Sequence, residues 1–227
     1  MENIKSMDLF GNALKNYYDG NKQSKIIINN LDGEPDIVPM SVFFRKEDEF
    51  NIDKEALCLC QGKILDVGAG TGDHALYLQN KGYDITAIDI SNDSCDIMRK
   101  RGIRNVLCCD FFNYHSENKF DTILLLGRSI GAVADINGFL DFLKISKKYL
   151  TSGGHILFNS VNEPSKDNWR TRKISFEYNG ENGDIVNWFD IGENLLKKLA
   201  KENGYYSEII TSEKDGNYLT LLTIGNQ

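Results

Sequence analysis

The sequence predicts an α/β fold built on a doubly wound, mostly parallel β-sheet. Strand-like and helix-like segments alternate through the middle of the chain, which is the pattern of a parallel sheet covered by helices on both faces. Residues 120–126 (FDTILLL) are apolar at nearly every position, as a buried central strand requires. A glycine-rich turn over residues 68–72 joins the first strand of this region to a helix.

The expected elements follow in chain order. Strands are expected at residues 63–68, 83–89, 105–109, 120–126 and 155–161. Helices are expected at residues 73–81, at about 91–101, at 136–150 and at 192–203. Gly82 and Gly102 end the first two of these helices. The chain closes with strand-like residues 205–211 and 218–224, which flank a turn and predict a hairpin.

Two segments lie outside this alternating pattern. Residues 1–50 form an N-terminal cap segment with a predicted amphipathic helix, and residues 51–227 form the main domain. Residues 162–191 are an insert after the fifth strand, longer than a normal connection and rich in aromatic side chains. Such a long connection is typical of a lid. We expect all of these parts to form a single structural domain.

Charge and composition exclude several classes of protein. The chain has 26 Lys and Arg residues against 33 Asp and Glu residues, and its net charge of −7 disfavours a nucleic-acid partner. Its apolar runs are too short for a membrane span, which needs about 18 residues or more. Five cysteines without a signal peptide favour a cytoplasmic location. Its three scattered histidines predict no metal site.

The glycine turn is the most informative segment. It reads Asp66-Val67-Gly68-Ala69-Gly70-Thr71-Gly72. The first glycine allows a tight turn, the second lets a ligand lie against the backbone, and the third lets the helix start close to the sheet. The spacing G-x-G-x-G differs from the G-x-G-x-x-G of dinucleotide-binding turns. The turn therefore predicts a ligand site without favouring a dinucleotide.

Three carboxylates follow the ends of successive strands. Asp66 beside the turn is badly placed for a pyrophosphate but well placed for an ammonium group. Asp89 ends the second strand, where a carboxylate accepts hydrogen bonds from ribose hydroxyls. Asp110 follows the third strand, where it could accept from an adenine amine. Together these acids describe a pocket for a nucleoside with an amino-acid tail and no phosphate, which is S-adenosylmethionine (SAM).

The same residues resemble a known family, the class I SAM-dependent methyltransferases, which have a Rossmann-like fold. The similar segments are ILDVGAGTGDHALYLQNKGYDITAIDIS, CCDFF, FDTILLLG and LTSGGHILFNS, and they cover about residues 60–161. The terminal hairpin fits the reversed last strand of that family. The segments FFRKEDEF, GDHALYLQ and LLLGRSIG look like those of a bacterial small-molecule subgroup.

The resemblance implies a role for each part of the cofactor site. The methionine portion would be held by Asp66, Gly68, Ala69 and Gly70, and Gly72 completes the cofactor-binding turn. The adenosine would be held by Asp89 and Ile90, by Asp110, and by the amide of Phe111. Leu126 and Gly127 would pass beneath the sulfonium.

Candidates for contact with the methyl acceptor come from three regions. They are Tyr17, Tyr18, Phe44 and Arg45 in the cap, Arg128 and Asn159 at strand ends, and Trp169, Arg172 and Tyr178 in the insert. Packing of the cap explains the aromatic residues about as well, and surface charge explains the arginines. If several arginines face the cavity, an anionic acceptor is favoured. We assign no catalytic residue, because methyl transfer from a sulfonium depends mainly on alignment.

The predicted function is transfer of a methyl group from SAM to a nitrogen or oxygen atom of a small molecule, releasing S-adenosylhomocysteine. The expected partner is that small molecule, with a monomer or homodimer as the assembly. A non-catalytic SAM-binding module or sensor subunit is the alternative from another class. A nucleotide-dependent dehydrogenase is opposed by the glycine spacing and by Asp66. Methylation of nucleic-acid bases is disfavoured, since the turn after the fourth strand reads Leu-Gly-Arg-Ser.

Overall fold

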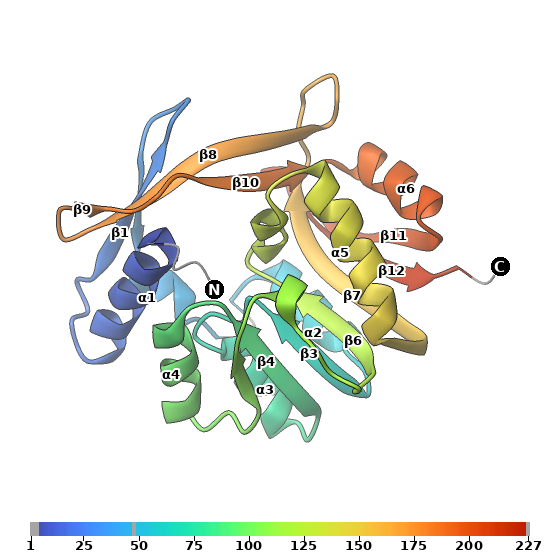
Figure 1. The fold of residues 1–227 in the computed structure, drawn as a ribbon, viewed down its shortest axis with the longest axis horizontal. Helices are drawn as coiled ribbons and strands as arrows, with labels where there is room; N and C mark the ends of the chain where they lie inside the picture. Colours follow the sequence, from blue (N-terminus) through green and yellow to red (C-terminus); the bar gives the residue numbers. More distant parts are fainter. Residues whose placement is uncertain (1–4, 47–48, 226–227) are drawn as a thin grey trace.

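The computed structural model describes residues 5–46 and 49–225, which form two β-sheets with flanking helices (Figure 1). The larger sheet has seven strands in the order β11-β12-β7-β6-β3-β4-β5. The smaller sheet has the order β10-β8-β1-β2, with the short β9 paired to β8. We call the smaller sheet the cap sheet. The chain crosses between the two sheets three times, before β3, after β7 and after β10.

The large sheet has the predicted mostly parallel arrangement. Its parallel strands are β3 (Lys63–Val67), β4 (Asp84–Asp89), β5 (Val106–Cys108), β6 (Phe120–Leu125) and β7 (Leu150–Val161). The hairpin strands are β11 (Tyr205–Ser212) and β12 (Asn217–Ile224), and β12 is antiparallel to both β7 and β11. The predicted α/β fold with a reversed hairpin strand is therefore confirmed.

Apolar side chains alternate between the two faces of this sheet because successive residues of a strand point to opposite sides. Leu65 and Ile123 belong to one core cluster, whereas Ile64 and Leu124 belong to another. The first cluster packs against α5 (Ile136–Tyr149) and α6 (Glu193–Glu202). The second packs against α2 (Asn51–Leu59), α3 (Asp73–Asn80) and α4 (Asn92–Lys100). Both faces are thus buried, as the apolar sequence of β6 predicted.

Side-chain caps explain where two of these helices begin. Ser91 precedes α4, and its hydroxyl accepts a hydrogen bond from the amide of Ser94 at 3.3 Å. Asp135 precedes α5, and its carboxylate accepts from the amide of Gly138 at 2.9 Å. Such caps satisfy amides that the first turn of a helix leaves without partners.

The cap sheet joins the N-terminal segment to the insert. Its strands are β1 (Lys25–Asn30), β2 (Asp36–Pro39), β8 (Trp169–Tyr178), β9 (Glu181–Asn182) and β10 (Val186–Ile191). The first strand pairs with β8 in antiparallel register, with Ile28 opposite Phe176. With α1 (Lys5–Tyr18) and the 3-10 turn η1 (Met40–Phe43), these strands enclose a third apolar cluster. The N-terminal cap segment and the insert after β7 therefore form one structural unit.

The cap sheet lies beside the large sheet at a defined place. Figure 1 shows β8 and β10 running from α1 and β1 toward the end of β7. There β10 packs on η3 (Ser129–Val133), the 3-10 turn after β6. A Cβ atom on Gly131 of η3 would lie 2.2 Å from Nε1 of Trp188, so the indole rests directly on the backbone of this turn.

Strand order locates the expected ligand crevice. The chain runs outward from β3 to β4 and β5 on one side and to β6 and β7 on the other. The order therefore reverses between β3 and β6, and ligands of such sheets bind at the carboxyl ends of the strands beside this point. The turn after β3 is the glycine turn, and the turn after β6 carries Gly127 and Arg128.

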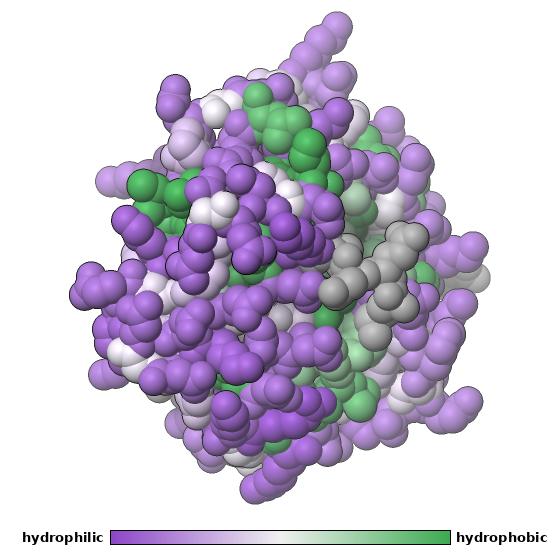
Figure 2. Space-filling model, turned by 60° about the vertical axis from the view of Figure 1, so that its left-hand side comes forward, coloured by the Kyte–Doolittle hydropathy of each residue, from purple (hydrophilic) through white to green (hydrophobic). Residues whose placement is uncertain are grey.

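The outer surface is mainly polar. Figure 2 shows one largely hydrophilic face with separate apolar patches. Large apolar side chains exposed in the described ranges are Leu31, Ile37, Phe50, Leu107, Ile185 and Tyr206. Within residues 5–46 and 49–225, no helix has the length and apolar character needed to cross a bilayer.

Candidate functional site

The glycine turn has the backbone geometry that its sequence predicts. Gly68, Gly70 and Gly72 have φ angles of +69°, +57° and +80°, a region that other residues adopt at a cost. The amides of Gly68 and Ala69 donate to the carbonyl of Ile88 at 2.9 and 3.1 Å, which ties the turn to the end of β4.

The glycines of this turn differ in their surroundings. A Cβ atom on Gly70 would meet nothing within 4 Å, so the backbone there is open to a ligand. On Gly72 it would lie 2.2 Å from Cδ1 of Ile103, so the helix start packs tightly. On Gly68 it would lie 2.9 Å from Cβ of Ser129, which places the turn after β6 directly against the glycine turn.

Asp66 is a buried carboxylate with an unsatisfied oxygen. Its exposed fraction is 1%, and Oδ2 has no hydrogen-bond partner among the described residues. Burial raises the pKa of Asp66 to about 6, and the nearby Asp89 and Asp53 carboxylates add to the rise while His74 opposes it. An ammonium group would supply both the missing hydrogen bond and the missing charge. The site therefore fits the amino end of an amino acid.

Asp89 closes β4 and braces the glycine turn. Its Oδ2 accepts from the amide of Gly70 at 2.8 Å, and its Oδ1 accepts from the amide of Ser91 at 2.8 Å. Burial raises the pKa of this carboxyl to about 6, although the backbone hydrogen bonds lower it. A carboxylate has about four acceptor positions, so both oxygens can still accept from ribose hydroxyls. The next residue, Ile90, is half-buried beside it.

Asp110 and Phe111 have local structural roles. Oδ1 of Asp110 accepts from the amide of Phe112 at 3.0 Å and caps the 3-10 turn η2 (Phe111–Asn113). The ring of Phe111 belongs to the core, with its centroid 5.2 Å from that of Phe142. The Phe111 ring is thus engaged in packing, and its amide is the part suited to contact adenine. Contact of either residue with adenine stays a prediction.

The turn after β6 is held in an unusual conformation. Gly127 has a φ of +68°, and Arg128, which is not a glycine, has a φ of +63°. The amide of Arg128 donates to Oδ1 of Asn159 at 2.9 Å, so β7 fixes this turn. Leu126 is 5% exposed and packs in the core. Leu126, Gly127, Arg128 and Asn159 are therefore brought together beside the glycine turn.

The cap covers the glycine turn through Arg45. The amide of Arg45 donates to Oδ2 of Asp73 at 3.0 Å, and its Nε donates to Oδ2 of Asp53 at 2.7 Å. A Cβ atom on Gly127 would lie 3.8 Å from Nη2 of Arg45, so this guanidinium lies beside the turn after β6. His74 also lies against Asp53, with Nε2 3.1 Å from Oδ2, although the angles fall short of a hydrogen bond.

Sequence reasoning missed Asp53 and Asp73. Asp53 lies in the first turn of α2 and is 3% exposed. Burial alone would raise the pKa of Asp53. The neighbouring His74 and Arg45 lower it by more, so the pKa of this carboxyl lies below its usual value. Acids in the first turn of a helix are common on protein surfaces, because they complement the helix dipole. The available signal, a carboxylate in the first turn of each helix, does not separate these two residues from surface acids.

The aromatic cap candidates cluster with one another. The ring of Phe44 stacks on Tyr17 and Tyr18, at centroid distances of 4.9 and 6.2 Å. The guanidinium of Arg101 lies 5.8 Å from the Phe44 ring and donates to the carbonyl of Thr71 in the glycine turn. These aromatics therefore lie near the glycine turn.

The candidates on β8 are spread along the strand. Trp169 packs on Phe189, with centroids 6.2 Å apart. Arg172 pairs with Asp190, its Nε 2.9 Å from Oδ2. Tyr178 is buried in the core of the cap, with its hydroxyl 3.2 Å from Oγ of Ser24. Trp169 and Tyr178 are the two ends of this 10-residue strand, about 30 Å apart. The structure thus joins Arg172 to the β6 turn but does not bring Tyr178 there.

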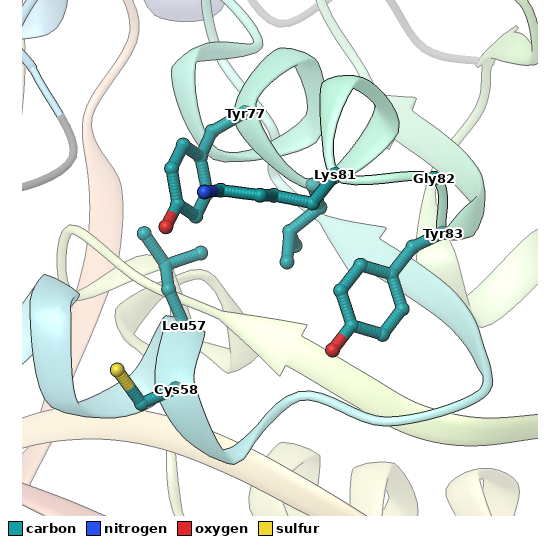
Figure 3. Close-up of a pocket in the computed structure, with 7 residues that line it drawn as sticks. Leu57, Cys58, Tyr77, Lys81, Gly82 and Tyr83 are labelled. Atoms are coloured by element: carbon teal, nitrogen blue, oxygen red, sulfur yellow. The ribbon is translucent and has the colours of Figure 1, made fainter.

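Two other features lie apart from this crevice. A hollow of about 380 Å³ is lined by Leu57, Cys58, Tyr77, Leu78, Lys81, Gly82 and Tyr83. Figure 3 shows this pocket in close-up. Since Gly82 and Tyr83 lead into β4, this hollow is at the opposite edge of the sheet from the glycine turn. In the part of the chain that the structure describes, no three His, Cys, Asp or Glu side chains gather as a metal site.

Comparison with known proteins identifies the family. A methyltransferase-domain family model matches residues 44–208, which is more than half of the chain. An uncharacterized methyltransferase from Staphylococcus carnosus (strain TM300) is 34% identical over 70 residues, or 31% of this chain and 34% of that protein. The matched part is therefore about one third of the length of that relative.

Solved structures agree with this result. A SAM-dependent methyltransferase from Bacteroides fragilis, crystallised with S-adenosyl-L-homocysteine, is 30% identical and has a TM-score of 0.90, with 98% of this chain and 97% of that chain covered. DesVI from Streptomyces venezuelae shares the fold, at 16% identity and a TM-score of 0.59, over 82% of this chain and 96% of that chain. The protein described here belongs to the class I SAM-dependent methyltransferase family.

Proposed function

We propose that this protein is an enzyme that transfers a methyl group from SAM to a nitrogen or oxygen atom of a small molecule, releasing S-adenosylhomocysteine. The observation that carries the proposal is the unpartnered Oδ2 of Asp66 beside an open glycine backbone. A buried carboxylate needs a cationic or hydrogen-bonding partner. The amino-acid end of SAM brings an ammonium group, whereas a dinucleotide brings a pyrophosphate, which Asp66 would repel.

The remaining cofactor residues follow from the order of the strand ends. Asp66 would bind the ammonium group, the backbone of residues 68–70 would lie along the methionine portion, and Asp89 would accept from the ribose hydroxyls. Asp110 and the amide of Phe111 would border the adenine. When bound, SAM supplies an electrophilic methyl group, and the chain supplies orientation and exclusion of water.

The acceptor would enter beside the turn after β6. Gly127 and Arg128 stand at the carboxyl end of this strand, and Arg45 lies across the turn from the cap side. The cap closes the glycine turn further through the contact between the Thr71 hydroxyl and the Phe43 carbonyl. Coverage of the glycine turn by the cap favours a small molecule over a protein chain. A general base is needed only for an acceptor that starts protonated, so no catalytic residue is assigned.

The test is a screen for production of S-adenosylhomocysteine. The full chain is incubated with SAM and with small amines, phenols and carboxylic acids, and the product is quantified by mass spectrometry. We expect at least one acceptor to give turnover that Asp66→Asn abolishes. If SAM binds while no compound is methylated, the alternative of a non-catalytic SAM-binding module or sensor subunit is favoured instead.

A further inference from the structure

Three arginines from two segments converge on one buried aspartate beside the crevice. Asp190 of β10 is 1% exposed and pairs through Oδ1 with Arg128. Its Oδ2 lies 2.9 Å from Nε of Arg172 and 3.7 Å from Nη2 of Arg170. Nε of Arg170 also lies 3.2 Å from Oε2 of Glu163. We call Arg128, Arg170 and Arg172 the arginine cluster.

The arginine cluster carries more positive charge than its ion pairs neutralise. Three guanidinium groups face two carboxylates, those of Asp190 and Glu163. The carboxylate of Asp215 is also near Arg128. It forms no ion pair with that guanidinium, because its oxygens accept hydrogen bonds from the amide and the side chain of Asn217. One positive charge is therefore left over in the direct contacts, although the whole chain is acidic.

The arginine cluster also has N–H donors that its ion pairs leave without an acceptor. Each guanidinium has five N–H groups in a planar fork. The carboxylates of Asp190 and Glu163, together with Oδ1 of Asn30 at 3.5 Å from Nη1 of Arg172, do not provide acceptors for all of them. Nε of Arg128 is buried and has no hydrogen-bond partner among the described residues. The Arg128 side chain is one third exposed, so its guanidinium, although paired with Asp190 through Nη2, keeps N–H groups that can donate to a ligand. Arg128 is also held in the left-handed region, at φ +63°, where residues other than glycine are strained.

The position of the arginine cluster matches the place of the methyl acceptor. Arg128 follows Gly127 directly, in the turn that lies against the glycine turn through Ser129. Arg170 and Arg172 are alternate residues of β8 and point to the same face of the cap sheet. Their cross-strand partners on β10 are Asp190 and Trp188. The arginine cluster therefore stands between the cap sheet and the end of β6.

We propose that the arginine cluster binds an oxyanion group, a carboxylate or a phosphoryl group, on the methyl acceptor. Arginine forks recognise such groups through paired, charge-assisted hydrogen bonds, and Asp190 holds the forks in place. This inference rests on the proposed methyltransferase function for the identity of the ligand. The binding of an oxyanion itself can be measured without turnover.

Tryptophan fluorescence provides that measurement. The chain has two tryptophans. Trp188 lies opposite Arg172 on β10, and Trp169 precedes Arg170 on β8 with its ring packed on Phe189. The full chain, with and without saturating S-adenosylhomocysteine, is titrated with sodium benzoate and separately with inorganic phosphate at constant ionic strength. We expect a saturable change in fluorescence with one of the two anions, and the responding anion distinguishes a carboxylate acceptor from a phosphoryl one. Benzamide, the neutral analogue of benzoate, should give none.

Two substitutions test the residues. Arg170→Gln removes a half-exposed arginine at the edge of the ion pairs, and Arg172→Lys keeps the charge but removes the fork. Each should weaken anion binding about tenfold or more, as expected for the loss of a charge-assisted hydrogen bond. Arg104→Gln, at an exposed position before β5, is the matched control and should bind like the wild type. Thermal melts of each variant confirm that it is folded.

Failure of this inference differs from failure of the proposed function. Saturable binding of S-adenosylhomocysteine without any response to either anion overturns the arginine cluster as an oxyanion site. Wild-type anion affinity in both Arg170→Gln and Arg172→Lys overturns it as well. An anion response without binding of S-adenosylhomocysteine keeps the oxyanion site and contradicts the methyltransferase function instead.

Discussion

At the scale of single residues, the site depends on buried charge that the ligand-free fold does not neutralise. Asp66 and Asp89 have pKa values near 6 because burial disfavours their charged forms. Their unfolded value is 3.8, so the folded protein binds more protons than the unfolded chain between about pH 4 and pH 6. Charging these carboxyls thus opposes folding increasingly as the pH rises through this window, and the cost is fully present above pH 6.

Substitution of Asp66 tests this balance between stability and binding. Asp66→Asn should stabilise the ligand-free protein at pH 8, by up to about 3 kcal/mol, because a shift of one pKa unit corresponds to about 1.4 kcal/mol. The gain should vanish near pH 4, where the wild-type carboxyl is protonated. The same variant should bind SAM at least about tenfold more weakly. Urea denaturation at both pH values and calorimetric titration measure the two effects.

The control for this experiment is Asp84→Asn. Asp84 is an exposed acid at the start of β4 and forms a surface ion pair with Lys63. Its substitution should change stability by less than about 1 kcal/mol at either pH and leave SAM affinity unchanged. A ligand-free Asp66→Asn variant less stable than wild type at pH 8 would contradict the view that this carboxylate lacks a partner.

At the scale of elements, two glycines of the turn have different roles. Gly72 packs against neighbouring side chains, and Gly70 leaves the backbone open to a ligand. Gly72→Ala places a Cβ against Ile103 and Met98 in the left-handed region, and should cost about 2 kcal/mol or more. Gly70→Ala meets open space and should cost about 1 kcal/mol, from backbone strain alone. SAM affinity should fall in Gly70→Ala, because the added methyl occupies the ligand side. Chemical denaturation and calorimetry of both variants check this ordering, and the reverse ordering of stabilities would be inconsistent with it.

The elements of the large sheet could be predicted because each carries its own signal. The strands β3, β4 and β6 are apolar on both faces, and the turn between β3 and α3 has its glycines at fixed spacing. The cap sheet could not be predicted in the same way. Its central strand β8 pairs with β1, which lies far away in the sequence, and such pairing is set by tertiary packing.

The same contrast holds within the site. The placement of Asp66 and Asp89 follows from the strand ends, whereas their contacts with a ligand remain predictions. Asp53 and Asp190 were missed because each is defined by partners on other elements, Arg45 and Arg128 among them. A buried acid that is paired with a distant arginine has the same local sequence as a surface acid.

At the scale of the whole molecule, several contacts hold the cap against the rest of the protein, and two of them can be tested by substitution. One is the indole of Trp188 on Gly131, and the other is the ion pair of Arg45 with Asp53. The two attachments flank the crevice, so they set how the acceptor side closes over the cofactor side. Disturbing either one should therefore change binding together with stability.

Gly131→Ala tests the first attachment. The added Cβ would lie 2.2 Å from Nε1 of Trp188, so the indole must move. We expect a loss of about 1–3 kcal/mol in stability and a shifted tryptophan emission maximum. Gly153→Ala is the matched control, since a Cβ there meets nothing within 4 Å, and it should leave the emission unchanged. Fluorescence spectra of both variants measure the emission maximum, and thermal melts measure the loss of stability.

Asp53→Asn tests the second attachment. It leaves the guanidinium of Arg45, whose side chain is 15% exposed, without its carboxylate and should destabilise the protein by about 3 kcal/mol at neutral pH. Because the folded pKa of Asp53 is lowered, its contribution is present above pH 3.8 and is lost as the pH falls through the folded pKa. Asp96→Asn, which breaks an exposed ion pair with Arg99, should cost under about 1 kcal/mol. Equal effects of the two substitutions in urea titrations would refute the proposed anchoring role.

Calorimetric titration of the full chain with S-adenosylhomocysteine, and in parallel with NAD, tests the central claim most directly. Binding of one S-adenosylhomocysteine per chain, at least about tenfold weaker in Asp66→Asn and absent for NAD, is the result that the buried, unpartnered carboxylate beside the glycine turn predicts. Binding of NAD without a response to S-adenosylhomocysteine would contradict it.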